Sequence, residues 1–189
     1  MSDTIIIGGL DLETTGLLKP EHRIIEVCVK QYEMHRQTGE AKLLQELTQR
    51  IDPQRSIDKK AFEVHKISEA DLVGKPTFEQ VAPSISRILD RCEVVVAHNG
   101  LEFDFLFLIQ EFERVGEELP DFEPFDTMMS GCWATAFGEV PSLKKLCFAC
   151  DVEYDADDAH AADYDVDKMM ESFFFGVGAG RFKLDNPNG

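Results

Sequence analysis

The stretch IIIGGLDLETTGL, residues 5–17, decides the fold that we predict for this chain. Three isoleucines and a glycine pair lead into Asp11 and Glu13, and a Thr-Thr-Gly turn signal follows. This is the pattern of a short buried strand that ends at a tight turn. Because residues two apart on a strand point to the same face, roughly 6.5 Å apart along the chain, Asp11 and Glu13 would present two carboxylates side by side.

The acidic pair has two interpretations. Carboxylates that are held close together and away from water repel one another, and a divalent cation such as magnesium or manganese, which prefers oxygen ligands, relieves that repulsion. Alternatively, the two residues are polar side chains on the solvent face of an edge strand, and an isolated Asp-x-Glu pattern favours this simpler interpretation. Further acidic residues elsewhere in the chain would favour the metal site.

The length and composition of the chain indicate a single domain whose cysteines are not joined in disulfide bonds. The 189 residues are 43% hydrophobic, which is enough to bury a substantial core. We find no apolar run long enough to span a membrane and no secretory signal at the N-terminus. The five cysteines are odd in number and scattered, which favours free thiols and a cytoplasmic location. Cys147 and Cys150 have the spacing of a metal knuckle but lack a second pair, so packing is the preferred interpretation.

The net charge of −17 is distributed unevenly along the chain. Residues 1–92 carry 13 Lys and Arg against 15 Asp and Glu, whereas residues 93–189 carry 6 against 21. So acidic a protein is not expected to bind a long duplex, because nucleic-acid affinity depends on neutralising phosphates. A local contact with one strand end, near the almost neutral first half, fits this distribution better.

The periodicity of the remaining chain predicts an α/β domain with a mixed sheet. Three antiparallel strands are expected first, namely the opening strand, residues 23–33 and residues 41–51, although the leucines of the third leave a helix possible. A wholly apolar strand at residues 93–97 fits the centre of a sheet that is covered on both faces. Helices are expected at residues 58–64, 78–89, 101–115, 126–133, 142–150 and 161–175. Pro120 and Pro124 indicate a linker, and the domain is expected to span residues 1–175, with a flexible tail at 176–189.

Two further stretches offer acidic side chains that could join the acidic pair. In AHNGLEFD a buried strand turns into an apolar helix, and Asp104 falls in the early turns of that helix, near the favourable end of its dipole. In AHAADYD, Asp165 lies beside the buried stripe of the helix that follows. Five helical residues rotate by about 140°, so His160 cannot share a helix face with Asp165 and must lie on the preceding loop or first turn. That arrangement would allow His160 to act as a base above Asp165, which would be a fixed metal ligand.

The stretches DLETTGL, HNGLEFD and HAADYD, in this order, resemble the three motifs of the DEDDh family of 3′–5′ exonucleases. The spacing of five from His160 to Asp165 is that of the third motif, and Tyr164, directly before Asp165, fits the tyrosine-bearing sister family poorly. The similarity extends over residues 4–175, and AFEVHKISEADLVGKPTFEQVA is similar to the corresponding region of the proofreading epsilon subunits of bacterial replicative polymerases. Lys60 departs from that pattern, since an acidic residue there can contact the substrate, and it leaves the substrate preference open.

The resemblance implies a ribonuclease H-like fold, with helices on both faces of the mixed sheet, and metal-dependent hydrolysis of phosphodiester bonds from a free 3′ end. Two Mg²⁺ or Mn²⁺ ions would be held by four carboxylates, those of Asp11, Glu13, Asp104 and Asp165. His160 would accept the proton of the attacking water, for which the ordinary imidazole pKa of about 6.5 is suitable. Four further residues would bind the terminal nucleotide: Thr14, Leu17, His65 and Phe103.

Three functions are compatible with this resemblance. The first is a 3′–5′ exonuclease that acts on DNA, preferably single-stranded DNA, and releases nucleoside 5′-monophosphates, alone or with a polymerase or other protein partner. The second is an exoribonuclease of the same fold that acts on RNA 3′ ends or short oligoribonucleotides. The third, a non-catalytic binding module, is disfavoured because such a module would be expected to lack at least one of the four carboxylates and the histidine. No membrane partner is expected.

Overall fold

The computed structural model describes residues 2–17, 20–155 and 161–184. Within these ranges the strands are β1 (Thr4–Thr14), β2 (Ile24–His35), β3 (Ala41–Arg50), β4 (Val94–Ala97) and β5 (Glu123–Asp126). The α-helices are α1 (Lys59–His65), α2 (Glu69–Leu72), α3 (Phe78–Leu89), α4 (Asp104–Val115), α5 (Leu143–Ala149) and α6 (Ala162–Gly178), and η1 (Cys132–Ala134) is a short 3₁₀ helix. None of the helices in these ranges has the length and apolar character needed to cross a membrane.

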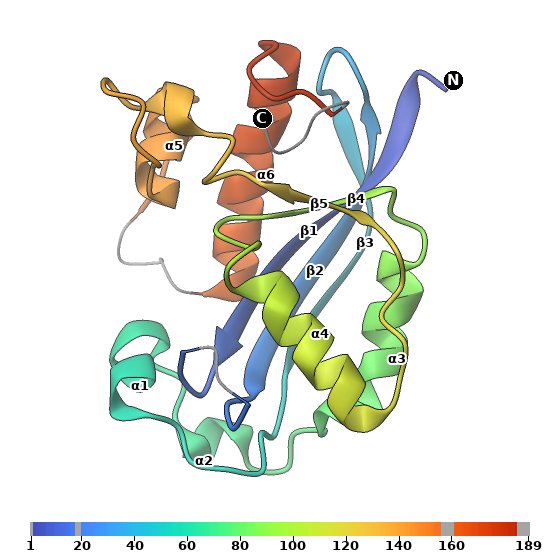
Figure 1. Cartoon of the computed structure of the whole chain (residues 1–189), viewed down its shortest axis with the longest axis vertical. Coiled ribbons are helices and arrows are strands. Elements are labelled where there is room, and N and C mark those ends of the chain that lie inside the picture. Colours follow the sequence, from blue (N-terminus) through green and yellow to red (C-terminus); the bar gives the residue numbers. More distant parts are fainter. Residues whose placement is uncertain (1, 18–19, 156–160, 185–189) are drawn as a thin grey trace.

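The strands form one mixed sheet with the order β3-β2-β1-β4-β5 (Figure 1). β1 pairs antiparallel with β2, and β2 with β3, whereas β4 lies parallel to both β1 and β5. The predicted α/β class and the three antiparallel strands at the start are confirmed, and residues 41–50 form a strand, not a helix. β1 therefore lies at the centre of the sheet, where elements from both halves of the chain reach its carboxyl end.

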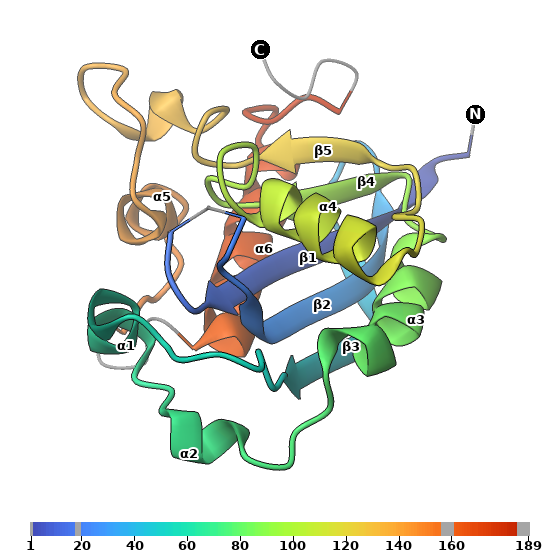
Figure 2. The ribbon, with the colours of Figure 1, turned by 60° about the horizontal axis from the view of Figure 1, so that its bottom comes forward.

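Helices cover both faces of the sheet (Figure 2), as predicted. On one face, α4 packs against β1 and α3 packs against β2 and β3, over a core that includes Leu10 and Leu12. On the other face, α6 packs against β1 and β2 over a core that includes Ile5 and Ile7, and α5 packs against α6. Because side chains alternate along a strand, the acidic pair at the end of β1 continues the face of the two isoleucines, toward α6.

α6 approaches β1 very closely at Gly9. A Cβ atom at Gly9 would come within 2.6 Å of Met170 Cγ and 3.1 Å of Val166 Cγ1. The absence of a side chain at Gly9 is what lets the helix approach this closely. The first turn of α6 is thereby brought against the carboxyl end of β1.

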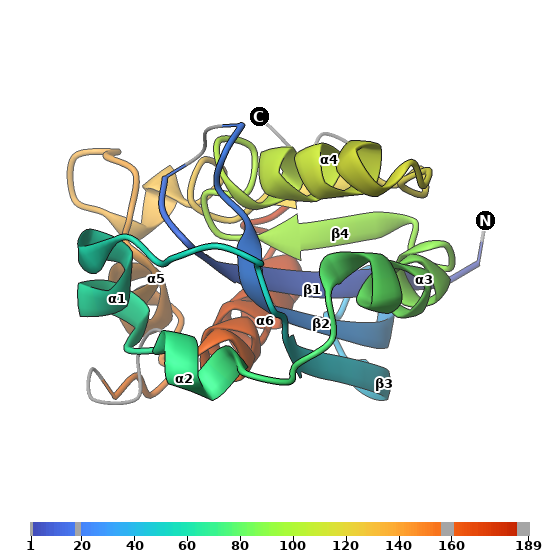
Figure 3. The same cartoon turned by 90° about the horizontal axis from the view of Figure 1, so that it is seen from below.

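α1 and α2 lie beyond the carboxyl end of β1, as the view from below shows (Figure 3). The turn after β1 is joined to the start of α1 by a backbone hydrogen bond, in which Asp58 N donates to Thr15 O at 2.9 Å. Ser68 begins α2 with a capping box, since its hydroxyl accepts from Asp71 N while the Asp71 carboxylate accepts from Ser68 N. This segment forms a wall beside the end of β1.

The region after α4 differs from the prediction. Residues 123–126 form β5 where a linker is predicted, and the helix predicted at residues 126–133 does not form, because turns occupy 127–131 and η1 begins at Cys132. β5 is an edge strand, and an edge strand tolerates Pro124 because one side of its backbone has no neighbouring strand. Phe125 and Asp126 are fully buried, so this segment belongs to the core.

The C-terminal helix continues past the domain boundary predicted at residue 175. α6 ends at Gly178, and Phe182 then packs with its ring centroid 5.8 Å from that of Phe173 and 5.3 Å from that of Phe125. Residues 176–182 therefore pack with the domain, which differs from the flexible tail predicted to begin at residue 176. Residues 185–189 lie outside the described part of the chain.

Candidate active site

Three elements bring four carboxylates together at the carboxyl end of β1. Asp11 and Glu13 come from β1 itself. Asp104 is the first residue of α4, and Asp165 lies in the first turn of α6. Asp104 and Asp165 are only 3% and 9% exposed, and the charges of Asp104, Glu13 and Asp165 all act on the ionisation of Asp11. The four predicted metal ligands thus lie in one cluster, which we call the acidic cluster.

Burial and neighbouring charges raise the pKa values of Asp11, Glu13 and Asp104. Burial, followed by the charge of Asp104, raises the pKa of Asp11 well above its ordinary value. Burial, followed by the charges of Glu26 and Asp165, raises the pKa of Glu13 to about 8. Burial raises the pKa of Asp104 to about 7. Because like charges in a poorly solvated site repel one another, the cluster needs either protons or a bound cation near neutral pH.

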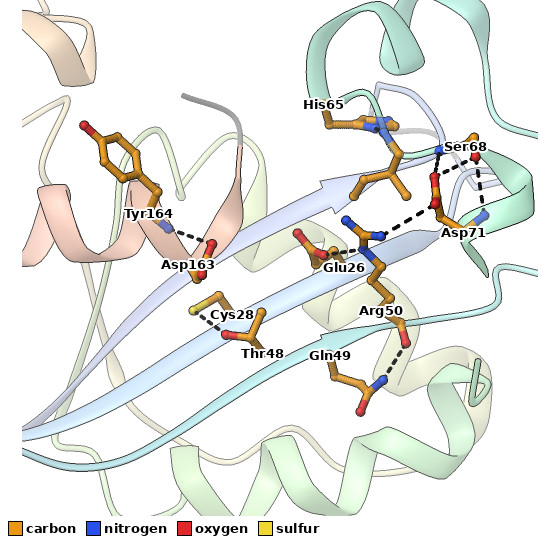
Figure 4. A network of polar contacts seen from close by, with 11 residues as sticks. Glu26, Cys28, Thr48, Gln49, Arg50, His65, Ser68, Asp71, Asp163 and Tyr164 are labelled. Carbon is orange, nitrogen blue, oxygen red and sulfur yellow. Dashed lines mark hydrogen bonds and ion pairs between the residues drawn. The ribbon is translucent and has the colours of Figure 1, made fainter. Parts of the chain in front are cut away.

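Glu26 on β2 is a further acidic residue beside the cluster, which we did not predict from the sequence. Glu26 is the register partner of Glu13 across the two strands and is 7% exposed. Its Oε1 accepts a hydrogen bond from Arg50 Nε at 2.9 Å, and Arg50 Nη1 lies 3.9 Å from Asp71 Oδ1 (Figure 4). Like charges directly opposite each other on neighbouring strands are destabilising, so Arg50 offsets part of the repulsion between Glu26 and Glu13.

Asp126 is a second buried acidic residue near the cluster, and the sequence motifs do not include it. Its carboxylate accepts hydrogen bonds from the backbone N–H groups of Asn99, Leu101, Met128 and Met129. These bonds join the end of β5 to the turn from which α4 starts. Asp126 therefore positions Asp104, which is the first residue of that helix.

An open pocket of about 570 Å³ lies beside the acidic cluster. All four residues predicted to bind the terminal nucleotide line it: Thr14, Leu17, His65 and Phe103. The Leu17 side chain is 76% exposed, whereas His65 is buried and its Nδ1 accepts a hydrogen bond from Ile67 N at 3.0 Å. Glu13 lines the same pocket, so the pocket opens onto the acidic cluster.

His22 fastens the turn after β1 to the start of α1. Its Nδ1 lies 3.0 Å from Thr15 Oγ1, and its Nε2 lies 3.7 Å from Asp58 Oδ2. A Cβ atom at Gly16 would lie 2.3 Å from the buried His22 ring, so a side chain does not fit there. The turn that supplies Leu17 to the pocket is therefore held against α1, which forms another wall of the same pocket.

His160, the predicted general base, lies outside the described residues. The described chain stops at Asp155 and resumes at Ala161, which is the N-cap of α6 and lies four positions before Asp165. The role of His160 therefore stays a prediction from the third motif.

The acidic cluster has the chemistry of a divalent-metal site. Its donors are carboxylate oxygens, the ligands that Mg²⁺ and Mn²⁺ prefer. Asp104 Oδ1 is buried and has no hydrogen-bond partner among the described residues, which leaves that oxygen available to a cation. Within the described ranges, no three Asp, Glu, His or Cys side chains form a group that could hold an ion by themselves. Ions at this cluster would take further ligands from water or substrate phosphate, as Mg²⁺ usually does.

Comparison with known families identifies the class of protein. Residues 9–173 match the exonuclease family RNase_T, a range that contains all three motifs and most of the chain. The chain therefore belongs to this family, and its resemblance to the DnaQ-like DEDDh 3′–5′ exonucleases is confirmed. Members of the family are hydrolases that generally depend on divalent metal ions.

Relatives of this chain include proteins that are named for work on DNA and on RNA. The chain is 30% identical over 166 residues to a PolC-type DNA polymerase III of Mycoplasma genitalium, and 29% identical over 173 residues to DNA polymerase III subunit epsilon of Escherichia coli K12. It is 27% identical over 177 residues to ribonuclease T of Vibrio vulnificus. Each match covers 87% of this chain, but the chain spans only 11% of the PolC-type polymerase, 68% of epsilon and 80% of ribonuclease T.

A solved structure shows that the fold is shared. E. coli exonuclease I in complex with single-stranded DNA superposes on this chain with a TM-score of 0.74 at 16% identity. The superposition covers 91% of this chain and 40% of the exonuclease I chain. The ribonuclease H-like exonuclease fold predicted from the sequence is thus confirmed.

Proposed function

We propose that this domain hydrolyses phosphodiester bonds at the 3′ end of DNA, preferably single-stranded DNA, and releases nucleoside 5′-monophosphates. The observation that supports this proposal best is that four carboxylates from three motifs form one cluster, and that Glu13 of this cluster also lines the neighbouring pocket. The volume of that pocket, about 570 Å³, lies in the range of pockets that bind small ligands, and a single nucleotide is such a ligand. An acidic cluster that cleaves the bond and a neighbouring pocket that holds one nucleotide can together remove terminal nucleotides one at a time.

The acidic cluster supplies the ligands in this proposal. Asp11, Glu13, Asp104 and Asp165 would hold two divalent ions. When bound, such ions stabilise the charge on the attacking and leaving oxygens of an in-line displacement. His160 would accept the proton of the attacking water as general base. The raised pKa values of the carboxylates support this assignment, because strongly perturbed groups beside a pocket are typical of functional sites.

The pocket residues would bind the terminal nucleotide without reading its sequence. Leu17 would press against the last base, and His65 and Phe103 would form walls of the pocket. Thr14 would contact the terminal 3′ hydroxyl. Apolar and aromatic surfaces accept any base, because every base has a flat face for stacking. We therefore expect cleavage rates that depend little on the terminal base.

DNA is the first choice of substrate because of the proteins that this chain resembles. The epsilon and PolC-type relatives are named as DNA polymerase III proteins, and the exonuclease I structure holds single-stranded DNA. Those names also support a polymerase as partner. The similarity to ribonuclease T makes an exoribonuclease the second candidate. Since the 2′-hydroxyl distinguishes RNA from DNA, initial rates on DNA and RNA oligonucleotides of matched sequence separate the two candidates.

A time course on 5′-labelled single-stranded DNA tests the proposal. In Mg²⁺ or Mn²⁺ we expect a ladder of products shortened from the 3′ end, and in EDTA we expect no products. Asp11→Ala should lower the rate by about a hundredfold to a thousandfold, which is typical when one electrostatic group at a reaction centre is removed. Asp121→Ala, at an exposed position away from the site, is the matched control.

Two outcomes contradict the proposed function. One is a folded Asp11→Ala protein, checked by circular dichroism, that degrades DNA at the wild-type rate. The other is release of the 5′ label as the first product, which shows the opposite polarity.

A further inference from the structure

Tyr154 places a hydroxyl group beside one member of the acidic cluster. It lies in the segment between α5 and α6, and its OH donates a hydrogen bond to Asp165 Oδ1 at 3.3 Å. Asp165 is 9% exposed and Tyr154 is half-buried, so this bond is partly shielded from water. Tyr154 belongs to none of the three motifs, and its contact with the cluster is visible only in the structure.

A second tyrosine holds Tyr154 in place. The rings of Tyr154 and Tyr164 pack with their centroids 5.7 Å apart. The Tyr164 hydroxyl accepts a hydrogen bond from Asp155 N at 2.6 Å, which ties the residue after Tyr154 to α6. Because Tyr164 directly precedes Asp165 on α6, the helix carries both the carboxylate and the ring that supports its hydrogen-bond donor.

A hydrogen bond at this position has a direct consequence for a metal ligand. A carboxylate binds an ion best when its oxygens already point in the required direction, and hydrogen bonds from neighbouring groups provide that orientation. The bond from Tyr154 restricts rotation of the Asp165 carboxylate about its Cβ–Cγ bond. Less conformational freedom is then lost when an ion binds, and the affinity for the ion is higher.

We propose that Tyr154 is a positioning residue of the metal site, which orients Asp165 for binding of a divalent cation. This inference rests on the proposed function, since it requires that Asp165 is a metal ligand. Tyr154 acts through Asp165 and needs no contact with the substrate.

Tyr154→Phe tests the inference, because it removes the hydroxyl and leaves the ring. The measurement is Mn²⁺ binding to the full chain without substrate, by isothermal titration calorimetry. We expect the dissociation constant for Mn²⁺ to rise roughly 10- to 100-fold, which is typical when the hydrogen-bonding partner of a ligand is removed. The melting temperature of the metal-free protein should not change, and excess Mn²⁺ should restore the cleavage rate.

The other two tyrosines of the chain provide matched controls. Tyr32→Phe removes a hydroxyl far along β2, and Tyr164→Phe removes one that accepts a hydrogen bond from Asp155 N. The inference predicts that both variants bind Mn²⁺ more tightly than Tyr154→Phe. Equal losses of affinity in Tyr154→Phe and Tyr164→Phe would overturn it, since the loss would then follow from the packing of the pair.

The failure of this inference can be distinguished from failure of the proposed function. Wild-type affinity in Tyr154→Phe, in a protein whose wild type binds Mn²⁺, overturns the role of Tyr154 and leaves the metal site standing. A wild-type protein that binds no Mn²⁺ overturns the metal site and the role of Tyr154 together.

Discussion

At the scale of single residues, the acidic cluster links the stability of the domain to pH. Burial and repulsion raise the pKa of Glu13 to about 8, and burial raises that of Asp104 to about 7. A carboxyl group whose pKa rises on folding stabilises the folded state while it is protonated, and this contribution is lost as the pH rises through the folded-state pKa. We therefore expect the free energy of unfolding of the metal-free domain to fall between about pH 5 and pH 8.

Urea unfolding in EDTA at a series of pH values measures this dependence. Addition of Mg²⁺ should restore stability most strongly at the high end of the range, because the ionised carboxylates bind the cation. Asp11→Asn removes one of the repelling charges and should flatten the metal-free profile. A wild-type profile that is already flat in EDTA contradicts the pKa assignments.

Leu17 should affect substrate binding and leave stability unchanged. Its side chain is 76% exposed in the structure, so Leu17→Ala should alter the free energy of unfolding by less than about 0.5 kcal/mol. Leu17→Ala removes three apolar carbons, each worth up to about 0.8 kcal/mol when it is buried against a base, so KM for single-stranded DNA should rise about fivefold or more. Val73→Ala is the control, since Val73 is 80% exposed and does not line this pocket. Equal KM values for the two variants would exclude Leu17 from the binding site.

Local sequence patterns predict some residues of the site and not others. Asp11 and Glu13 can be predicted as neighbours because a strand places every second side chain on one face, whatever surrounds it. Glu26 cannot be predicted in the same way, because its place opposite Glu13 depends on the register between two strands. Asp126 gains its role from backbone groups about 25 residues earlier in the chain, and no local pattern indicates that pairing.

At the scale of elements, the contact between β1 and α6 makes Gly9 a structural requirement of the site. Gly9→Ala would force Met170 to move, since Met170 Cγ lies 2.6 Å from the position of the new Cβ. We expect a loss of about 1–3 kcal/mol in the free energy of unfolding, as for other overpacked cores. The cleavage rate should fall as well, because a displaced α6 carries Asp165 with it.

Gly8→Ala provides the comparison for this prediction. A Cβ atom at Gly8 would meet Cys92 Sγ at 3.2 Å on the opposite face of the sheet, which is a milder contact. Urea unfolding and cleavage rates of both variants should show the larger losses for Gly9→Ala. If Gly8→Ala loses as much stability and activity, the close approach of α6 is not what Gly9 provides.

Sequence periodicity predicts the long elements and fails for a short one. α3 is predictable because its apolar residues recur at helical spacing and Thr77 begins it with a capping box. β5 is not, because it has four residues, one of which is Pro124, and is defined by its pairing with β4. When β5 is not recognised, the apolar residues that include Met128 and Met129 resemble part of an amphipathic helix, which is why a helix is predicted at residues 126–133.

At the scale of the whole molecule, the net charge of −17 limits how the domain binds nucleic acid. A footprint on many phosphates would need many cations, and residues 93–189 carry only 6 Lys and Arg. We expect the affinity for single-stranded DNA to fall only gently with salt. A log–log slope no steeper than about −2 corresponds to two or three phosphate contacts, at about 0.7 for each. KM values measured across a range of NaCl concentrations at fixed Mg²⁺ give this slope, and a much steeper one would indicate an additional cationic surface.

The central position of β1 also determines when the site can exist during protein synthesis. β1 leaves the ribosome before the other strands and helices of this domain, and its neighbour β4 and its covering helix α6 come much later. Asp165 is added 154 residues after Asp11, which takes roughly 8 to 30 seconds at ordinary rates of translation. A nascent or prematurely terminated chain therefore carries the first two carboxylates without the last one. If the acidic cluster is the active site that we propose, fragments that end before α6 are expected to be inactive, because the cluster is complete only once almost the whole domain has been translated.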